Sequence, residues 1–432
     1  MPKETSGQMI SWERARGRSK ILAIGVAVAA VVAAWYGVSW QIGNMLAELT
    51  PPSQPDSQEV AQLAVALAPS DPATRWLVAT KEKEKFSPES IENATRLFED
   101  VVRRSPNDYR WWIELGRSNE QAEQTENAEA AFGRAAQLAP NFTFPHWQLG
   151  NFYLRQNRTE DAFAELKKAT EGSLLYRDQV FSLAWDYFDK DPAKVEELAA
   201  DTPDVKASLA LFFAVRNSPV DALRVWNTLP DEEKAAHPVI AKSIAQGFFD
   251  KQFYRESLEF ARQSGLDPEA RAETISNGGF ESFIGADDSL YSWKVNRNDG
   301  KLDIATDSSV KHTGARSIRF AFRGYAKPVL SNLSQFVAVQ ASKKYRISFW
   351  VRTENLRSGG SPQLEIANAN DATLLAVSHP FAGSSNEWEQ ITLDIVTPAN
   401  CSGIVIRTGR QSCGECPIFG TFWYDDFSIV PQ

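Results

Sequence analysis

The spacing of hydrophobic positions changes twice along the chain. Residues 21–40 are apolar and include no charged residue. From about residue 71 to 270 the apolar positions follow a helical period, and after Pro268 they alternate with polar ones among frequent Gly, Ser, Asn and Thr. The pattern therefore predicts an apolar helix, then a helical region, then an all-β region.

The helical region repeats itself. Pro72, Pro106 and Pro140 stand 34 residues apart, a period typical of stacked helix–turn–helix units. The unit that ends at Pro140 resembles the tetratricopeptide (TPR) repeat, with Asn119 in place of an aromatic residue. The residues that carry this resemblance, here and one period later, are Trp112, Leu115, Gly116, Ala128, Phe132, Pro140, Leu149, Gly150, Tyr153 and Ala162.

These residue types suit the packing of paired helices. Gly116 and Gly150 would sit where two antiparallel helices approach most closely, large side chains would fill the space between units, and proline would end a helix. Less regular repeats are expected to follow, with a helix around Phe181–Phe188 and helix pairs at Ala210–Trp226 and Ile244–Phe260. The resemblance implies a groove that binds a protein partner.

The apolar run suits a membrane anchor. Twenty helical residues span about 30 Å, the thickness of a hydrocarbon core. A basic flank precedes the run, and Trp35, Tyr36 and Trp40 lie at its far end. The positive-inside rule then makes residues 1–20 cytoplasmic and 21–41 a transmembrane helix, with the remainder outside the cytoplasm. A cleavable signal peptide is the alternative, although its apolar region is usually shorter and ends at small residues.

Residues 42–70 are expected to form a linker and a first helix, since Pro51, Pro52 and Pro55 indicate a short stiff linker over 50–58. The repeats would occupy residues 71–270 and the β domain 275–432. The net charge of −9 and the absence of a dense basic patch beyond the N-terminal flank argue against a nucleic-acid partner.

The β region carries a second resemblance. It opens with Asn277–Glu281 (NGGFE) and closes with Trp423–Phe427 (WYDDF), with Trp293, Gly314 and Trp388 between them. This set is similar to carbohydrate-binding modules of the family 4/9/22 type and implies a jelly-roll sandwich. Strands are expected at Ser317–Phe322, Tyr345–Arg352, Gln363–Ala367, Glu389–Val396, Gly403–Arg407 and Phe422–Val430.

Alternation separates the two faces of these strands. Phe349 would face the core, while Trp350 and Arg352 would face outward. Arg407 would face outward from another strand. An outward Trp can stack on a sugar ring and arginines can donate to its hydroxyls, so these three are the candidate sugar contacts. Alternatively, Trp350 packs under a loop or against the repeats.

The second resemblance also implies a structural calcium ion, because its opening and closing motifs lie together in such modules. Glu281 and Asp426 would be the ligands, and no other cofactor is expected. The alternative is that both carboxylates form a salt bridge or cap a turn.

All three cysteines, Cys401, Cys413 and Cys416, fall within the β domain. A disulfide from Cys401 to Cys413 or Cys416 is expected, with one thiol left over. The C-x-x-C spacing alone also suits redox exchange or zinc, but no second pair or nearby His completes a zinc site. The four histidines are scattered and no nucleotide or hydrolase motif occurs, so the chain is expected not to be an enzyme.

These features together predict a scaffold tethered to the outer side of a bacterial inner membrane. The repeats would bind a protein, and the sandwich would bind polysaccharide or a second protein. Such anchored arrays resemble parts of exopolysaccharide-export and envelope-assembly machines. Two alternatives remain: an adaptor that binds only proteins, and an accessory subunit of a polysaccharide-processing enzyme.

Overall fold

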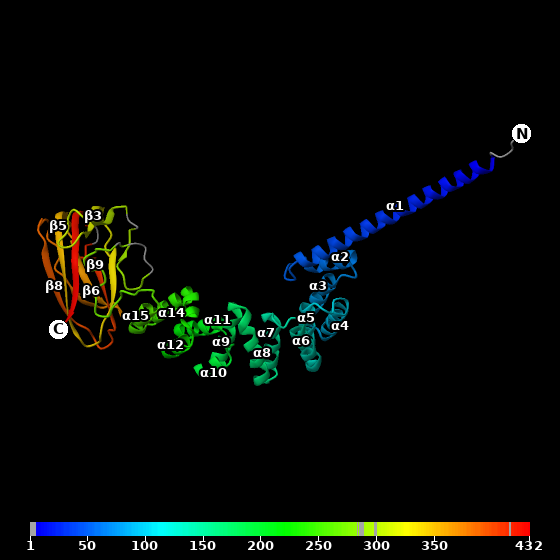
Figure 1. The fold of residues 1–432 in the computed structure, drawn as a ribbon, viewed down its shortest axis with the longest axis horizontal. Coiled ribbons are helices and arrows are strands. Elements are labelled where there is room, and N and C mark those ends of the chain that lie inside the picture. Colours follow the sequence, from blue (N-terminus) through cyan, green and yellow to red (C-terminus); the bar gives the residue numbers. More distant parts are fainter. Residues whose placement is uncertain (1–5, 283, 285–288, 298–299, 414–415) are drawn as a thin grey trace. The chain divides into compact units, whose positions relative to one another are not determined.

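A computed structural model of the 432-residue chain describes residues 6–432, except 283, 285–288, 298–299 and 414–415 (Figure 1). Side chains are described from Leu22 onward, so the side chains of the predicted cytoplasmic segment, residues 1–20, lie outside the described residues. The chain divides into two compact units, residues 1–183 and 184–432.

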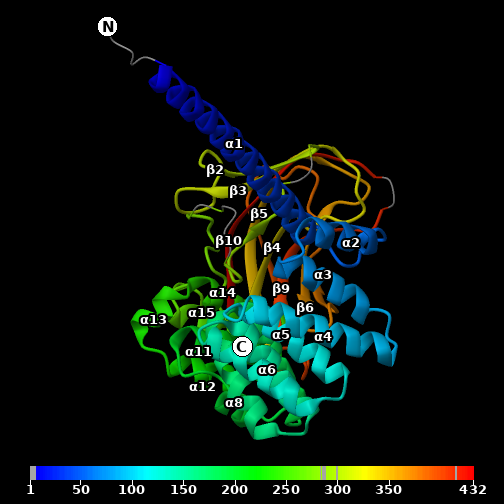
Figure 2. The same cartoon turned by 90° about the vertical axis from the view of Figure 1, so that its right-hand side faces the viewer.

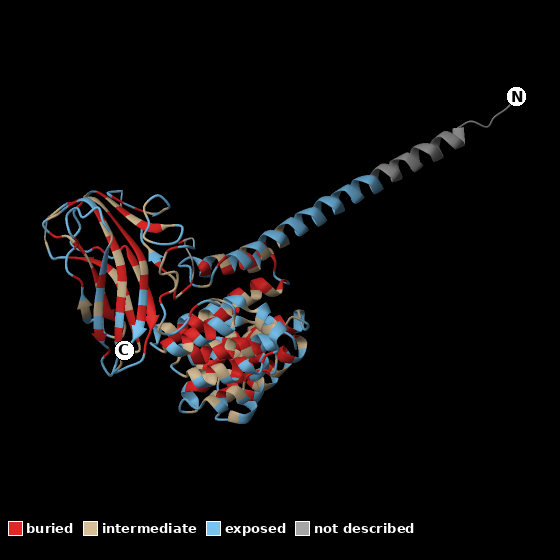
Figure 3. Cartoon of the chain, turned by 60° about the vertical axis from the view of Figure 1, so that its left-hand side comes forward, coloured by how far each residue is buried: buried red, intermediate tan, exposed pale blue. Residues whose placement is uncertain are grey.

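The first unit opens with a 44-residue helix, α1 (Ser6–Leu49). Its segment Leu22–Leu49 has a mean hydropathy of 2.0 and is long and apolar enough to cross a membrane. Apolar side chains such as Val31 and Trp35 are largely exposed, and most of the described part of this helix is coloured as exposed (Figure 3). The sequence placed the end of the apolar helix at residue 41, whereas the helix continues to Leu49 because Gly43, Leu46 and Ala47 pack against the helices that follow.

Helices then follow one another through short turns. They are α2 (Ser57–Leu67), α3 (Pro72–Lys83), α4 (Pro88–Arg104), α5 (Tyr109–Gln121), α6 (Thr125–Leu138), α7 (Thr143–Arg155), α8 (Thr159–Gly172) and α9 (Leu174–Tyr187). Helices α3 with α4, α5 with α6, and α7 with α8 form the packed pairs. Asp71, Ser87 and Asp108 cap helix N-termini with their side chains, which satisfies backbone N–H groups that lack helical partners.

The 34-residue period corresponds to a repeated close contact within these pairs. A Cβ added to Gly116 of α5 would lie 2.8 Å from the ring of Phe132 in α6. A Cβ added to Gly150 of α7 would lie 2.7 Å from Leu166 in α8. Only glycine allows each pair to close at this distance.

The second unit continues the helices from within α9. They are α10 (Pro192–Glu197), α11 (Pro203–Val215), α12 (Pro219–Asn227), α13 (Asp231–Ala236), α14 (Pro238–Asp250) and α15 (Tyr254–Gln263). The stretches Ala210–Trp226 and Ile244–Phe260 fall on the pairs α11/α12 and α14/α15. The short helix α13 interrupts the alternation of pairs.

The strands form two five-stranded antiparallel sheets. Sheet A has the order β1-β4-β9-β6-β7 and sheet B the order β2-β3-β10-β5-β8. Their bounds are β1 (Lys294–Val295), β2 (Leu302–Asp307), β3 (Ser317–Tyr325), β4 (Leu333–Ala338), β5 (Lys344–Arg357), β6 (Pro362–Asn368), β7 (Leu374–Val377), β8 (Glu389–Val396), β9 (Gly403–Arg410) and β10 (Ile418–Pro431).

One hydrophobic core lies between the two sheets. It holds side chains from both, including Phe320, Phe349 and Tyr424 of sheet B and Ile366 and Ile406 of sheet A. The predicted fold class is confirmed: an apolar N-terminal helix, helical repeats and a two-sheet sandwich.

Helices α14 and α15 cover part of the outer face of sheet A. Phe336 of β4 points away from the core, and its ring centroid lies 4.8 Å from that of Phe249 and 4.5 Å from that of Tyr254. The Tyr254 hydroxyl donates to the Ala369 carbonyl at 3.1 Å. A Cβ on Gly403 of β9 would collide with the Phe336 ring, so glycine permits this contact.

Candidate functional site

The opening and closing motifs of the sandwich come together in the structure. The Phe427 N–H donates to the Gly278 carbonyl at 2.9 Å, and the indole N–H of Trp293 donates to the Asn277 carbonyl at 3.1 Å. The ring of Phe280 meets that of Phe427 edge to face, with centroids 5.9 Å apart. Residues almost 150 positions apart in the sequence therefore form one end of the core.

A β-bulge in β10 directs two neighbouring carboxylates to one place. The register against β5 shifts between Asp425, which opposes Trp350, and Ser428, which opposes Ser348. Asp426 takes a positive φ of 49° within this shift. The extra residue places Asp425 and Asp426 against the same loop and returns Phe427 to the core.

That loop precedes β3 and is held by both carboxylates. Asp425 accepts from the backbone N–H of His312 at 2.7 Å, and Asp426 accepts from the His312 ring at 2.7 Å. The Thr313 hydroxyl donates to Asp426 at 2.8 Å. Burial, and then the nearby Asp426 carboxylate, raise the pKa of Asp425, although the His312 N–H opposes this.

The held loop completes a set of aromatic side chains on the outer face of sheet B, which we call the outer-face cluster: His312, Trp350, Trp388 and Trp423. His312 stacks on Trp350 with centroids 3.8 Å apart at 18°, and meets Trp388 edge to face at 5.8 Å. The indole N–H of Trp423 donates to Asp307 at 3.0 Å, and the Arg352 guanidinium lies 5.9 Å from the Trp423 ring centroid.

The structure places Phe349 in the core and Trp350 and Arg352 on the outer face, where both are half-buried. Trp350 is not a bare platform, because His312 covers one face of its ring. This contact agrees with the alternative prediction that Trp350 packs under a loop. Part of Trp350 and of Trp388 stays accessible beside the loop.

The grouping of Arg407 with these residues is wrong. Arg407 does face outward, but β9 belongs to sheet A whereas β5 belongs to sheet B. The outer faces of the two sheets are opposite surfaces of a sandwich. Arg407 instead pairs with Glu365 on neighbouring strand β6, at 2.9 Å.

Glu281 and Asp426, the expected calcium ligands, both hold the turn of residues 312–315 through hydrogen bonds. Both Glu281 oxygens accept from the Ala315 N–H, at 2.9 and 3.0 Å. The Asp426 oxygens accept from His312 and Thr313. Among the described residues no group of three or more His, Cys, Asp or Glu could hold a metal ion. The two carboxylates cap the turn of residues 312–315.

The expected disulfide from Cys401 is also wrong. Cys413 and Cys416 bond to each other, with Cα atoms 5.7 Å apart, whereas Cys401 is fully buried and its thiol donates to the Gly403 carbonyl. Strand β9 separates Cys401 from Cys413, and its eight residues span about 26 Å. A disulfide needs Cα atoms within about 7 Å. Burial raises the pKa of the Cys401 thiol.

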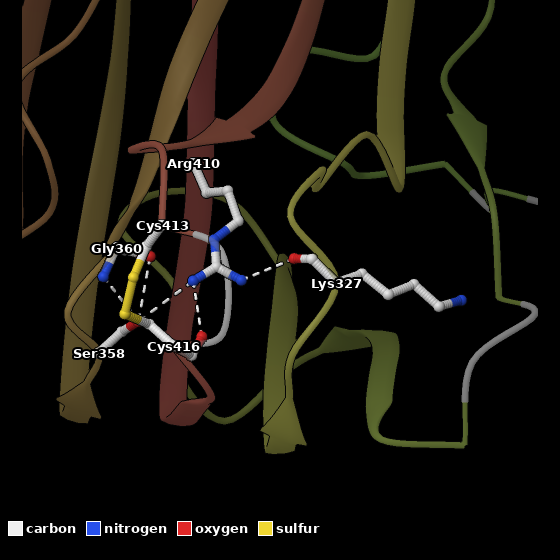
Figure 4. Close-up of a disulfide and its surroundings, with 6 residues drawn as sticks. All are labelled: Lys327, Ser358, Gly360, Arg410, Cys413 and Cys416. Carbon is white, nitrogen blue, oxygen red and sulfur yellow. Dashed lines mark hydrogen bonds between the residues drawn. A yellow bond between two sulfur atoms is a disulfide. The ribbon is translucent and has the colours of Figure 1, made fainter.

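A buried arginine lies next to the disulfide (Figure 4). Arg410 donates to the carbonyl of Cys416 at 2.8 Å and to that of Lys327 at 2.7 Å. Burial lowers the pKa of its guanidinium. Arg410 therefore ties the β9–β10 connection to the loop that follows β3. Gly414 and Glu415 of the C-x-x-C motif lie outside the described residues.

In the repeats, the residues that carry the TPR resemblance lie at contacts within or between helix pairs. Ala128, Phe132 and Ala162 are fully buried, and Leu115 and Leu149 nearly so. The Tyr153 hydroxyl donates to Glu129 at 3.1 Å. The Trp112 indole N–H donates to the Pro106 carbonyl, and the Pro140 carbonyl contacts the His146 ring, each at 2.9 Å.

The first helices of successive pairs are linked by polar side chains. Lys83 of α3 reaches Glu114 of α5 at 3.4 Å, and Arg117 of α5 reaches Gln148 of α7 at 3.3 Å. The Arg117 guanidinium also lies 5.6 Å from the Phe144 ring centroid. These half-buried polar and aromatic side chains form a continuous stripe that joins the three pairs.

Sequence reasoning missed His312 and Asp425. His312 is 114 residues from Asp426 and in a loop, so no periodic or motif spacing marks it. Asp425 belongs to the closing motif and alternation assigns it to the outer face, but only the bulge reveals that it shares the loop with Asp426.

Comparisons with known proteins agree with the C-terminal resemblance. Residues 272–411 match the CBM_4_9 family model, described as a carbohydrate binding domain. The predicted carbohydrate-binding-module-like domain is thus confirmed. None of the curated proteins matches the chain.

Solved structures are similar to separate parts of the chain. A CBM4 structure is 18% identical and covers 37% of this chain and 99% of its own, with a TM-score of 0.26. TmCBM61 in complex with β-1,4-galactotriose is 18% identical over 38% of this chain and 100% of its own, also at 0.26. Residues 41-end of MamA from Desulfovibrio magneticus RS-1 are 23% identical over 32% of this chain and 74% of their own, again at 0.26.

Proposed function

We propose that this protein is a membrane-anchored scaffold outside the cytoplasm that binds a protein through its helical repeats and glycan through its C-terminal sandwich. The outer-face cluster, within a domain that matches a carbohydrate-binding family, is the observation that carries the proposal. The setting we propose is exopolysaccharide or envelope assembly at a bacterial inner membrane.

The outer-face cluster offers the chemistry that sugars need. The accessible parts of Trp350 and Trp388 provide apolar surface for the C–H face of a sugar ring. Arg352 lies on the same face two residues from Trp350, and its guanidinium can donate to ring hydroxyls. The hydrogen-bonded His312 loop holds the aromatic rings in place. A ligand would therefore bind across β5 and β8 beside this loop.

The repeats offer a surface suited to a peptide segment. The stripe that runs across α3, α5 and α7 combines charged groups with the aromatic ring of Phe144. Such a mixed surface can bind side chains of several types along an extended chain. The function that we propose for both regions is binding rather than catalysis.

The N-terminal helix supports the membrane anchor. Its apolar segment is exposed in the structure, and Trp35, Tyr36 and Trp40 lie toward the end that leads into the repeats. The basic residues before it favour a cytoplasmic N-terminus. The repeats and sandwich would then lie on the periplasmic side.

Glycan binding tests the central claim. The full chain in detergent would be applied to a glycan array and to native gels that contain soluble bacterial polysaccharides. Trp350→Ala is expected to lower the affinity for the bound glycan at least tenfold, because stacking and the His312 contact are both lost. Arg407→Ala is the matched control: it removes an outward side chain from the opposite sheet and should leave binding unchanged.

Equal losses from Trp350→Ala and Arg407→Ala would contradict the assignment to sheet B. If the wild type binds no glycan, the chain is better explained as an adaptor that binds only proteins. The stacking of His312 on Trp350 favours that second candidate, because this contact occupies one ring face without any ligand. Identification of co-purified proteins from detergent-solubilised membranes would then become the decisive measurement.

A further inference from the structure

The apolar helix α1 continues into the repeat region without a break. Its last turns pack against α2, as Figures 1 and 2 show. A Cβ on Gly43 would lie 2.7 Å from the Cβ of Ala68 and 2.8 Å from the carbonyl oxygen of Ala64. Ala47, one turn later, is fully buried in a cluster with Ala61. The end of α1 is thus itself the first helix of the repeats.

The turn between α1 and α2 is fixed by hydrogen bonds. The Ser57 hydroxyl donates to the Pro52 carbonyl at 2.8 Å, and Lys81 of α3 donates to the same carbonyl at 2.9 Å. The Asn44 side chain donates to Asp71, the N-cap of α3, at 3.2 Å. The predicted stiff linker over residues 50–58 is therefore a packed turn followed by the start of α2.

This packing sets the distance of each turn from the apolar segment. Helix α2 runs back along α1, so its C-terminal end lies beside Gly43 and the α2–α3 corner (residues 68–71) lies beside Asn44. Asn44 is four residues beyond Trp40, or about 6 Å along the helix axis. The α1–α2 turn begins after Leu49, five residues or about 8 Å further out along α1.

A Trp at the end of an apolar helix favours the lipid–water interface. The headgroup layer outside the hydrocarbon core is about 5–8 Å thick on each side. If Trp40 lies at the interface, the α2–α3 corner reaches the outer edge of the headgroups, whereas the α1–α2 turn lies clear of them.

We propose that the α2–α3 corner rests on the phospholipid headgroup surface and that the repeats are a direct continuation of the membrane anchor. The inference rests on the membrane anchoring proposed above and adds a second, peripheral contact with lipid. Arg75 lies near this corner, where its Nε donates to the Pro69 carbonyl at 2.7 Å and its guanidinium pairs with Asp100 of α4 at 3.1 Å, which joins the corner to the next helix pair. The partner-binding surface of the repeats is then held at a fixed height above the bilayer.

Fluorescence quenching by labelled lipids measures this height. Ser70, in the corner, and Ser53, in the α1–α2 turn, are both exposed and can be replaced singly by Cys. Cys401 is buried and Cys413 is bonded to Cys416, so a maleimide nitrobenzoxadiazole dye reacts with the introduced thiol. The full chain is reconstituted in phosphatidylcholine vesicles that contain a headgroup nitroxide lipid.

We expect quenching at Ser70→Cys to be several-fold stronger than at Ser53→Cys. Equal quenching, or stronger quenching at Ser53→Cys, would overturn the proposal. Failure of the protein to float with the vesicles would contradict the anchor itself, so the two claims fail in different measurements.

Two glycines of α1 provide a matched pair of variants. In the Ser70→Cys chain, Gly43→Leu should reduce quenching to the level of Ser53→Cys, because leucine cannot fit against Ala64 and Ala68. Gly37→Leu should keep the quenching unchanged, since a Cβ there meets nothing within 4 Å. Full quenching in the Gly43→Leu chain would show that helix packing does not hold the corner at the lipid surface.

Discussion

At the scale of single residues, two kinds of position decide the structure: glycines where helices close, and outward side chains of the sandwich. Gly116 and Gly150 share one environment 34 residues apart, against Phe132 and Leu166. Gly133 of α6 differs, because a Cβ added there meets nothing within 4 Å. Close packing therefore requires glycine at position 116 but not at position 133 of the same helix pair.

Replacement of Gly116 or Gly150 by Leu should lower stability by about 1–3 kcal/mol, the usual cost of overpacking. Gly133→Ala should instead raise stability by up to about 1 kcal/mol, because alanine has the higher helix propensity. Thermal melting of the full chain in detergent, followed by circular dichroism at 222 nm, measures both. Melting temperatures that do not differ among the three variants would contradict this packing.

Neighbouring residues of β5 should respond differently to truncation. Phe349 is fully buried and stacks on Phe427 with centroids 5.1 Å apart. Phe349→Ala should cost about 3–5 kcal/mol, whereas Trp350→Ala should cost less because Trp350 is half-buried. Near-ultraviolet circular dichroism during urea unfolding distinguishes the two. A greater loss for Trp350→Ala would reverse the assignment of faces.

At the scale of elements, polar contacts and aromatic clusters connect neighbouring helices and strands. His146 of α7 contacts Glu165 of α8 at 2.5 Å and the Pro140 carbonyl at 2.9 Å. Both ring nitrogens face acceptors, so the doubly protonated imidazolium suits this environment. Hydrogen bonding to Glu165 raises the pKa of His146 despite the opposing effect of burial.

A histidine whose pKa is raised in the folded state contributes most to the free energy of unfolding at pH values where its ring is protonated in both the folded and the unfolded state. The contribution of His146 is therefore complete below its unfolded value of about 6.5 and is lost as the pH rises through the higher folded value. We expect the stability difference between wild type and His146→Gln to shrink from pH 6 to pH 9. Because His237 also has a raised pKa, the difference between the two chains, measured by urea titration, is the informative quantity. A difference that grows with pH would contradict the assignment.

The contact between α14/α15 and sheet A depends on Phe336, which packs against Phe249 and Tyr254. Phe336→Ala should speed hydrogen exchange in residues 238–263 about tenfold or more, since the cavity left behind weakens this contact. Phe419→Ala, which truncates an exposed ring on β10, is the control and should leave exchange there unchanged. Equal exchange in wild type and Phe336→Ala would mean that these helices are stable without the sheet.

At the scale of the whole molecule, the membrane anchor that we propose for the N-terminal helix would decide on which side of a membrane the two units lie. The basic flank and the aromatic end of the apolar run both favour an uncleaved anchor with the bulk of the chain outside the cytoplasm. The packing of Gly43 and Ala47 into the repeats gives a structural reason to retain the end of this helix, since loss of residues 43–47 would expose Ala61 and Ala64.

A fusion tests this orientation directly. Alkaline phosphatase joined after Gln432 should be active, because it folds only where its disulfides form. N-terminal sequencing of the protein isolated from membranes should find a first residue before residue 21, with the apolar segment intact. An inactive fusion, or a mature N-terminus near residue 34, would contradict an uncleaved anchor.

Sequence periodicity alone determined the order of the parts. The apolar run, the 34-residue spacing and the alternation after Pro268 each reflect a local geometric rule: helix rise, helix pairing or strand pleat. Each of the six expected strands overlaps a strand of the structure, whereas β1, β2, β4 and β7 were not predicted. The opening and closing motifs correctly marked the sandwich because they lie in its core.

Only the tertiary structure decided which surfaces and side chains meet. Alternation shows that Trp350 and Arg407 both face away from a core, but it cannot show that β5 and β9 belong to opposite sheets. The position of His312 on Trp350 depends on a bulge at Asp425–Asp426, and the isolation of Cys401 depends on the length of β9. Strand order, bulges and loop paths come from contacts between residues far apart in the chain, and a local pattern contains no information about them.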